Sequence, residues 1–273
     1  MKNLFLSKWY KAFYPRNLST FPKRILQLLS FLFANSSFYL QGQMDINKKS
    51  LWYSKKLISF NGGFLPLNHK KNSTRRIFNI EPWDYVRRDM ILLLLKDIEE
   101  NKVEGAFAEL GVYQGSTARL IHHYSPYRKF YLFDTFDGFT GKGVETENLN
   151  TGNSFSYKQF SDTSIDKVKN FIDPQNSNLL FYPGYFPDSI SDKIIDKKFS
   201  FVHIDADLYQ PIMDGLLFFY KRLSPGGVIL VHDFHAWPGA YRAVKDFSSK
   251  HKVPYVPMPD KSGSAVFKKD YFN

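Results

Sequence analysis

The sequence predicts an α/β fold built on a doubly wound, mostly parallel sheet, and three observations support this prediction. Short apolar runs alternate with segments of helical periodicity from residue 84 to residue 267. A turn that contains two glycines joins the first apolar run to the helix that follows it. Acidic residues stand at or just after the ends of several runs, which is where open α/β sheets bind ligands.

Strands and helices are expected to alternate along this part of the chain. A first helix, at 84–100, has apolar residues at helical spacing and should cover one edge of the sheet. Strands are predicted at 106–110, 129–133, 179–182, 200–204 and 228–231. Further helices are predicted at 116–123, 164–172, 212–222 and 239–250, with a closing hairpin within 255–267. The sequence S-P-G-G at 224–227 is expected to close the helix before it.

A long polar segment at 138–160 interrupts this alternation. It contains four glycines. Loops of this length are usually functional or disordered. A lid over a cleft is one interpretation of the segment.

The basic charge of the chain is concentrated in its first part. The whole sequence of 273 residues has a net charge of +11, whereas residues 1–80 carry +13 with a single acid, Asp45. The remaining residues carry −2, so this larger part is close to neutral. A nucleic-acid partner is not expected. In a protein that binds nucleic acid, basic residues line the binding face, whereas the larger part of this chain is close to neutral. We interpret 1–75 as a basic, aromatic extension with a linker, and 76–273 as the main domain.

Two roles are open for the extension. Its basic and aromatic residues would suit contact of residues 1–60 with an anionic membrane surface. The alternative is a helical extension that packs on the core or on a second subunit of a homo-oligomer. The apolar stretch at 25–40 is too short and too polar to span a bilayer, and no signal-peptide cleavage site is evident. The absence of cysteine excludes disulfides and fits a reducing compartment such as the cytoplasm.

The segment E-L-G-V-Y-Q-G at 109–115 follows a predicted strand and opens a predicted helix. Gly111 would allow a tight turn, and Gly115 a close approach of the backbone to a ligand. The spacing differs from the G-x-G-x-x-G of dinucleotide sites, and Glu109 places a carboxylate where a pyrophosphate would lie. A ligand with cationic groups suits this site better, and S-adenosylmethionine has both an ammonium and a sulfonium.

Asp134, in the segment F-D-T-F-D-G-F, ends the second predicted strand. An acid at that position can accept hydrogen bonds from both hydroxyls of a ribose. Asp137 stands nearby but directly precedes Gly138, as is typical of a turn. Position therefore favours Asp134 as the ligand contact.

Acids also follow the fourth and fifth predicted strands. Asp205 and Asp207, in H-I-D-A-D-L-Y, would point to the same side if the strand continued. Two acids this close raise one another's pKa unless a cation lies between them or one acts as a base. Asp233 follows the next strand and could share a divalent ion with Asp205, for which carboxylates and water favour Mg²⁺ or Mn²⁺. A hydroxyl bound to such an ion would lose its proton more easily.

The histidines near these acids differ in their expected roles. His203 lies inside an apolar run and is interpreted as a core histidine with satisfied hydrogen bonds. His235 lies beyond Asp233 in a loop, and a role there is the less favoured of two interpretations. His122 and His123 stand late in a helix, where cations suit the helix dipole, and we assign them no chemistry.

Taken together, these segments resemble the macrocin O-methyltransferase (TylF) family of S-adenosylmethionine-dependent sugar O-methyltransferases. The matching stretches are E-G-A-F-A-E-L-G-V-Y-Q-G-S, Y-L-F-D-T-F-D-G-F, P-G-Y-F-P-D-S, F-V-H-I-D-A-D-L-Y and R-L-S-P-G-G-V-I-L-V-H-D-F, followed by W-P-G-A-Y-R-A-V-K-D-F. They lie within residues 104–247, just over half of the chain. The resemblance implies a Rossmann-like class I methyltransferase sheet of seven strands with a reversed last strand.

The resemblance also implies roles for single residues. It implies S-adenosylmethionine contacts at Glu109, Gly111, Tyr113, Gly115, Asp134, Thr135, Gly184 and Asp205. It implies a magnesium site at Asp205, His232 and Asp233, with Asp207 as general base. The antibiotic-pathway members carry Asp-Asp where this chain has His232-Asp233, and imidazole binds Mg²⁺ poorly and prefers zinc, copper, iron or nickel. Another metal, or no metal, is therefore open at this site.

The implied acceptor is a hydroxyl of a sugar, in a natural product or in a surface polysaccharide. A neighbouring hydroxyl often helps to bind the metal in such acceptors. Two alternatives remain open from the sequence: a catechol-type small molecule as acceptor, or an idle methyltransferase-like module that docks through its basic extension. The expected location is the cytoplasm, with contact to the inner face of the membrane as an option for the extension.

Overall fold

The computed structural model describes residues 84–139, 141, 144–145, 147–148, 156, 159–175 and 177–271. The predicted extension and its boundary at residue 75 lie outside the described residues, as does most of the predicted loop at 138–160.

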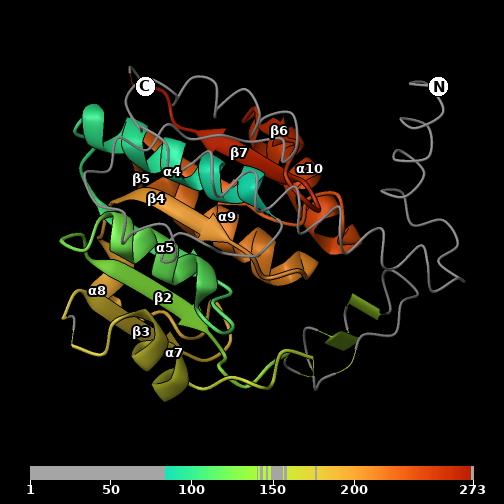
Figure 1. Ribbon diagram of the computed structural model, residues 1–273. Coiled ribbons are helices and arrows are strands. Elements are labelled where there is room, and N and C mark those ends of the chain that lie inside the picture. The colour runs from blue at the N-terminus through green and yellow to red at the C-terminus, as the bar shows by residue number, and fades with distance from the viewer. Residues whose placement is uncertain are drawn as a thin grey trace, which may run out of the picture. The chain divides into compact units, whose positions relative to one another are not determined.

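The described part of the chain forms one sheet of seven strands, in the order β3-β2-β1-β4-β5-β7-β6 (Figure 1). The strands are β1 (Ala106–Leu110), β2 (Phe130–Asp134), β3 (Leu179–Pro183), β4 (Phe199–Ile204), β5 (Leu223–Val231), β6 (Val256–Met258) and β7 (Ser264–Lys268). Strands β1 to β5 pair in parallel, whereas β7 runs antiparallel to both β5 and β6. The predicted doubly wound sheet with a reversed last strand is confirmed.

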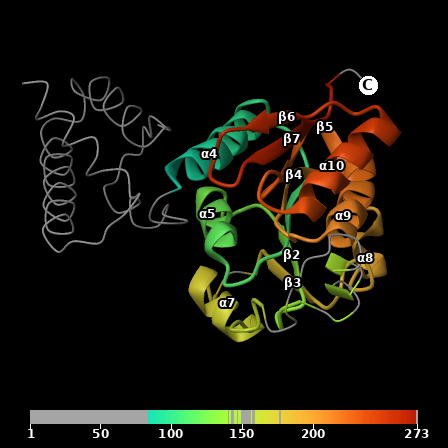
Figure 2. The same ribbon diagram turned by 90° about the vertical axis from the view of Figure 1, so that its right-hand side faces the viewer.

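Helices cover both faces of this sheet, as expected for strands linked by crossover connections. The helices are α4 (Tyr85–Glu100), α5 (Ser116–Tyr124), α7 (Ile165–Ile172), α8 (Asp192–Ile195), α9 (Tyr209–Arg222) and α10 (Pro238–His251). Figure 2 shows α4, α5 and α7 on one side of the sheet and α8, α9 and α10 on the other. None of the described helices is both long enough and apolar enough to cross a bilayer.

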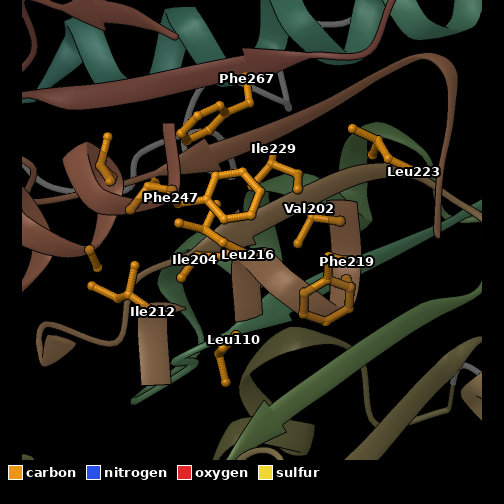
Figure 3. Close-up of a cluster of buried hydrophobic side chains, with 14 of the residues drawn as sticks. Leu110, Val202, Ile204, Ile212, Leu216, Phe219, Leu223, Ile229, Phe247 and Phe267 are labelled. Atoms are coloured by element: carbon orange, nitrogen blue, oxygen red, sulfur yellow. The ribbon is translucent and has the colours of Figure 1, made fainter. Parts of the chain in front are cut away.

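The core has two layers because successive side chains of a strand point to opposite faces. In β4, Val202 and Ile204 join the cluster under α9 and α10, whereas Phe201 joins the cluster under α4 and α5. Figure 3 shows part of the first cluster, in which Leu216 and Phe219 of α9 lie among the strand residues. The same alternation turns His203 toward α4, which brings it into the functional site described below.

The structure differs from the sequence-based expectation at α8, at the start of α9 and at the start of β5. Helix α9 begins at Tyr209, before the expected start at residue 212, and α8 was not expected at all. Strand β5 begins at Leu223 and includes the S-P-G-G sequence, which was expected to form a turn outside the strand. The pairing of β5 with β4 shifts in register there, and Gly226 has a φ of 78°. The chain therefore passes this breaker sequence as an irregularity within the strand rather than as a loop.

Candidate active site

A cavity of about 420 Å³ opens at the carboxyl ends of the parallel strands. Its walls come from the segments that directly follow β1, β2, β3, β4 and β5, together with Asp84 and Arg87 near the start of α4. The predicted site residues that line it are Glu109, Gly111, Tyr113, Asp134, Thr135, Gly184, Asp205, Asp207, His232 and Asp233. Gly115 is the one predicted site residue that does not line it.

Glu109 projects from β1 into the buried side of this cavity. Its Oε1 lies 2.9 Å from Nδ1 of His203, while its Oε2 has no hydrogen-bond partner among the described residues. Burial raises the pKa of Glu109 well above its usual range, and the nearby Asp205 adds to this, whereas Arg87 opposes it. A buried carboxylate oxygen without a partner is costly. A cationic ligand in the cavity would remove that cost.

His203 links Glu109 to Arg87. Burial and the positive charge of Arg87 lower the pKa of His203 to about 3, so the imidazole is neutral. Nη2 of Arg87 lies 3.4 Å from Nε2 of His203. Because a guanidinium can only donate, Nε2 accepts and Nδ1 carries the proton that is donated to Glu109. The prediction of a core histidine with satisfied hydrogen bonds is confirmed.

Arg87 is a site residue that the sequence analysis missed. Nη2 of this arginine also donates to Oδ2 of Asp205 at 2.6 Å and lies 3.3 Å from the hydroxyl of Thr117. Arg87 is only 5% exposed and stands one helical turn before Met90 and Ile91, which are core residues. A lone arginine on the apolar stripe of a helix was the available signal, because charged residues are rarely buried unless they are paired.

Asp134 ends β2 and organises the loop that follows β1. Its Oδ2 accepts hydrogen bonds from the backbone N–H groups of Val112 and Tyr113, at 2.7 and 2.9 Å. Its Oδ1 accepts one from the N–H of Phe136 at 2.7 Å. Asp137, by contrast, is exposed and does not line the cavity. The geometry thus agrees with the choice of Asp134 over Asp137.

The two glycines of the β1–α5 turn serve the packing of the protein itself. A Cβ on Gly111 would lie 2.1 Å from the carbonyl oxygen of Asp205, so a glycine is needed for the ends of β1 and β4 to approach. A Cβ on Gly115, where φ is 85°, would lie 2.9 Å from Cγ1 of Val168 in α7. These contacts give Gly115 a role in packing against α7, and its contact with a ligand stays a prediction. This glycine faces α7, and its left-handed conformation starts α5.

Replacing Gly115 by alanine should lower the free energy of unfolding by about 1–2 kcal/mol, which is the usual cost of a left-handed conformation for a residue with a Cβ. The affinity for S-adenosylhomocysteine should change little, because Gly115 does not line the cavity. Denaturant unfolding and titration calorimetry measure the two quantities. A large loss of affinity at unchanged stability would return Gly115 to the ligand site.

Three side chains form a tight cluster where β4 and β5 end. Nδ1 of His232 lies 3.1 Å from Oδ1 of Asp205 and 3.2 Å from Oδ1 of Asp233. Burial would raise the pKa of Asp205, but His232 and Arg87 outweigh it and hold that pKa well below its usual range. Burial would likewise lower the pKa of His232, yet Asp205 and Asp233 raise it to about 10. An imidazolium therefore bridges the two carboxylates.

Asp207 lies beside this cluster, in a conformation that is uncommon for a residue with a side chain. Strand β4 ends at Ile204, and the φ of Asp207 is 59°, while that of Asp233 is 56°. Left-handed backbone conformations of this kind concentrate at functional sites. Burial, with the negative charges of Asp205 and Asp233 and a hydrogen bond to Asp233, raises the pKa of Asp207 well above its usual range.

Two further acids lie behind His232. Nε2 of His232 lies 3.7 Å from Oδ2 of Asp260, in the β6–β7 turn, and Asp84 lies close to both. The hydroxyl of Ser264 donates to the same oxygen of Asp260 at 2.7 Å. Sequence reasoning missed both acids, because Asp84 stands at a helix N-cap and Asp260 in a turn, where aspartate is common anyway.

None of the other histidines in the described part of the chain lines the cavity. His235 is exposed, and its ring lies against Phe234. His122 lies 3.4 Å from Asp173, and His123 contacts the carbonyl of Ile172. Neither interpretation made for these residues from the sequence requires a change.

The sequence of the domain that carries this cavity matches a known protein family. Residues 86–269 match the model of one protein family, which is described as macrocin O-methyltransferase (TylF). The chain belongs to this family. The TylF match begins next to Arg87 and ends just after β7, so it includes every strand of the sheet.

Individual relatives of this TylF protein are distant. The demethyldecarbamoylnovobiocin O-methyltransferase of Streptomyces niveus is 24% identical over 176 residues, which are 61% of this chain and 67% of the relative. The mycinamicin III 3''-O-methyltransferase of Micromonospora griseorubida is 28% identical over 165 residues, 55% of this chain and 63% of the relative. The solved structure of the O-methyltransferase NovP superposes with a TM-score of 0.57 at 24% identity, over 67% of this chain and 79% of that one.

As a TylF family member, the chain is an S-adenosylmethionine-dependent O-methyltransferase. The structural likeness to NovP shows the class I methyltransferase fold. The predicted family and fold class are thus confirmed. The roles of the individual cavity residues stay predictions.

Proposed function

We propose that this chain transfers a methyl group from S-adenosylmethionine to a hydroxyl of a sugar, in a glycosylated natural product or a surface polysaccharide. The observation that supports this most is the single cavity that joins Glu109 and Asp134 to Asp207. The acceptor class rests on a relative from Streptomyces olivaceus, 24% identical over 193 residues, which is named as an 8-demethyl-8-(2,3-dimethoxy-alpha-L-rhamnosyl)-tetracenomycin-C 4'-O-methyltransferase. Neither observation names the sugar that this chain methylates.

The cavity residues fit S-adenosylmethionine. The unpartnered Oε2 of Glu109 would accept a hydrogen bond from the ammonium of the amino-acid part, which removes the cost of its burial. Asp134 would accept the ribose hydroxyls, with Tyr113, Thr135 and Gly184 around the nucleoside. When bound, this cofactor supplies an electrophilic methyl group. The contribution of the protein is to hold that group in line with the acceptor hydroxyl and to exclude water.

Asp207 is the proposed general base. Asp207 is only 8% exposed and lines the cavity together with Asp205 and Asp233. Asp207 would take the proton of the acceptor hydroxyl while the acceptor oxygen bonded to the methyl carbon and the bond from that carbon to the sulfonium sulfur broke, with S-adenosylhomocysteine as the leaving group. A raised pKa makes the carboxylate a stronger base once it has lost its own proton.

The pH dependence of turnover should report this pKa. Asp207 must be unprotonated to act, and its pKa lies well above that of an ordinary aspartate. The rate should therefore rise with pH through that raised pKa and then level off, instead of being flat over the whole range. Measuring kcat from about pH 5 to pH 9 at constant ionic strength tests this. A flat profile over that range would contradict a role for a perturbed aspartate.

The sequence also predicts a magnesium ion, or manganese, on Asp205, His232 and Asp233. The ligand atoms of these residues lie within 4.8 Å of one another, which a shared ion requires. Their chemistry does not fit Mg²⁺. Both oxygens of Asp205 already accept hydrogen bonds, from Arg87 and from His232, and magnesium selects oxygen ligands over imidazole. We therefore propose a mechanism with no step through a metal ion.

Product analysis separates the possible acceptors. The full chain would be incubated with S-adenosylmethionine and panels of sugars, glycosides and catechols, and the products examined by mass spectrometry. A mass increase of one methyl group on a sugar supports the proposal, and methylation of catechols alone would overturn the acceptor class. Binding of S-adenosylhomocysteine without any turnover would instead favour the idle module.

The cellular location and the oligomeric state of the chain stay predictions. The proposed cytoplasmic location rests on the absence of cysteine, whereas the contact of residues 1–60 with a membrane and the proposed homo-oligomer involve the extension. That extension lies outside the described residues. Liposome binding at low and high salt would test the membrane contact, since electrostatic attraction is screened by salt.

A further inference from the structure

The side chains of Arg87 and His232 both contact Asp205, at the place where the sequence predicts a metal ion. Nδ1 of His232 lies between Oδ1 of Asp205 and Oδ1 of Asp233, at 3.1 and 3.2 Å. Ionised carboxylates can only accept hydrogen bonds, so a ring nitrogen between two of them acts as a donor. A nitrogen that carries a hydrogen has no lone pair for a metal. In this arrangement His232 cannot be a metal ligand through Nδ1.

The other nitrogen of His232 is directed away from Asp205 and Asp233. Nε2 lies 3.7 Å from Oδ2 of Asp260, whose side chain is fully buried. Acidic groups thus stand on both edges of the ring, and Asp84 adds a third behind it. This arrangement holds the imidazole in place between the carboxylates.

Arg87 supplies a second, permanent positive charge at the same point. Nη2 of Arg87 lies 2.6 Å from Oδ2 of Asp205, and the same nitrogen contacts His203 and Thr117. Because a guanidinium does not lose its proton in proteins, it would repel a divalent ion on Asp205 at any pH.

We propose that this chain methylates its acceptor without a divalent ion, because Arg87 pairs with Asp205 and the ring of His232 lies between Asp205 and Asp233 in its place. The proposal rests on the proposed function for the identity of the reaction. Arg87 and His232 act as positioning residues: they hold Asp205 and Asp233, and Asp233 in turn is hydrogen-bonded to the base, Asp207. The proton of the acceptor passes to Asp207, and no other group is needed to balance the step.

The first experiment is a metal titration of the unmodified chain. Full-length protein is freed of metals with a chelator, saturated with S-adenosylhomocysteine and titrated with Mg²⁺ and with Mn²⁺ in a calorimeter. We expect no binding of either ion up to millimolar concentration. We also expect EDTA to change turnover of the acceptor by less than twofold. Binding at micromolar concentration that is lost in Asp233→Asn would overturn the proposal.

The second experiment restores a metal site. His232→Asp places a third carboxylate beside Asp205 and Asp233, so the variant should bind Mg²⁺, and its turnover should require the added ion. His235→Asp is the matched control, because this exposed histidine stands three residues away and does not line the cavity. The control should neither bind Mg²⁺ nor lose activity.

The outcomes are separable from those of the proposed function. If the unmodified chain binds no metal but methylates no sugar, the acceptor class fails while the inference about the ion stands. If His232→Asp is folded and binds no Mg²⁺, the assignment of the effect to His232 is overturned. If that variant does not fold, the titration of the unmodified chain still decides the question.

Discussion

Replacing Asp207 by asparagine should reduce kcat by about 100- to 10,000-fold, the range typical for loss of a general base. The amide has nearly the same shape but cannot take the proton of the acceptor hydroxyl. In the proposed mechanism Asp207 contacts the acceptor hydroxyl, whereas Glu109 and Asp134 contact the cofactor. The affinity for S-adenosylhomocysteine should therefore remain within a few-fold of that of the unmodified chain.

The measurements are single-turnover rates with an identified acceptor and calorimetry with S-adenosylhomocysteine. Asp196→Asn is the matched control, because this exposed aspartate follows α8 and lies just before the amino end of β4, on the edge of the sheet opposite the cavity. The control should leave both quantities unchanged. Turnover of Asp207→Asn close to that of the unmodified chain would remove Asp207 from the role of base.

Replacing Asp134 by asparagine should weaken S-adenosylhomocysteine binding by about 100-fold, since two hydrogen bonds to a charged acceptor are together worth roughly 3 kcal/mol. A second effect acts in the same direction. The carboxylate accepts three backbone N–H groups, from Val112, Tyr113 and Phe136, and an amide N–H₂ would face at least one of these donors. The loop after β1, which forms one wall of the cavity, should then lose its fixed position.

Asp137→Asn is the matched control for this prediction. Asp137 stands three residues after Asp134, in the segment that follows β2. It is exposed and does not line the cavity. Calorimetry should show unchanged affinity for this variant. Equal affinity losses in both variants would mean that charge in the loop matters rather than the position of Asp134, and the proposed ribose contact would be wrong.

Much of the fold follows from patterns that are local in the sequence. The apolar run at Ala106–Leu110 forms a strand, and a glycine turn follows it, because alternation and backbone freedom act over a few residues. Acids placed directly after such runs must reach one edge of a parallel sheet. For this reason Glu109, Asp134 and Asp205 line one cavity, as the order of the segments predicts.

Interactions between distant segments were beyond sequence reasoning. Arg87 and Asp205 are 118 positions apart, and only the packing of α4 over β4 brings them within hydrogen-bond distance. The packing role of Gly115 was hidden for a similar reason, since its close neighbour, Val168, belongs to a helix that follows the next strand. In both cases the local sequence was compatible with several partners.

The sequence by itself determined the family, the order of the strands along the chain and the positions of the acids at the strand ends. Only the tertiary structure decided what those acids contact. His232 stands between Asp205 and Asp233, and Arg87 approaches Asp205 from α4. The physical reason is that strand ends are set by short-range alternation, whereas the charge balance of a buried cluster depends on which helices pack over it.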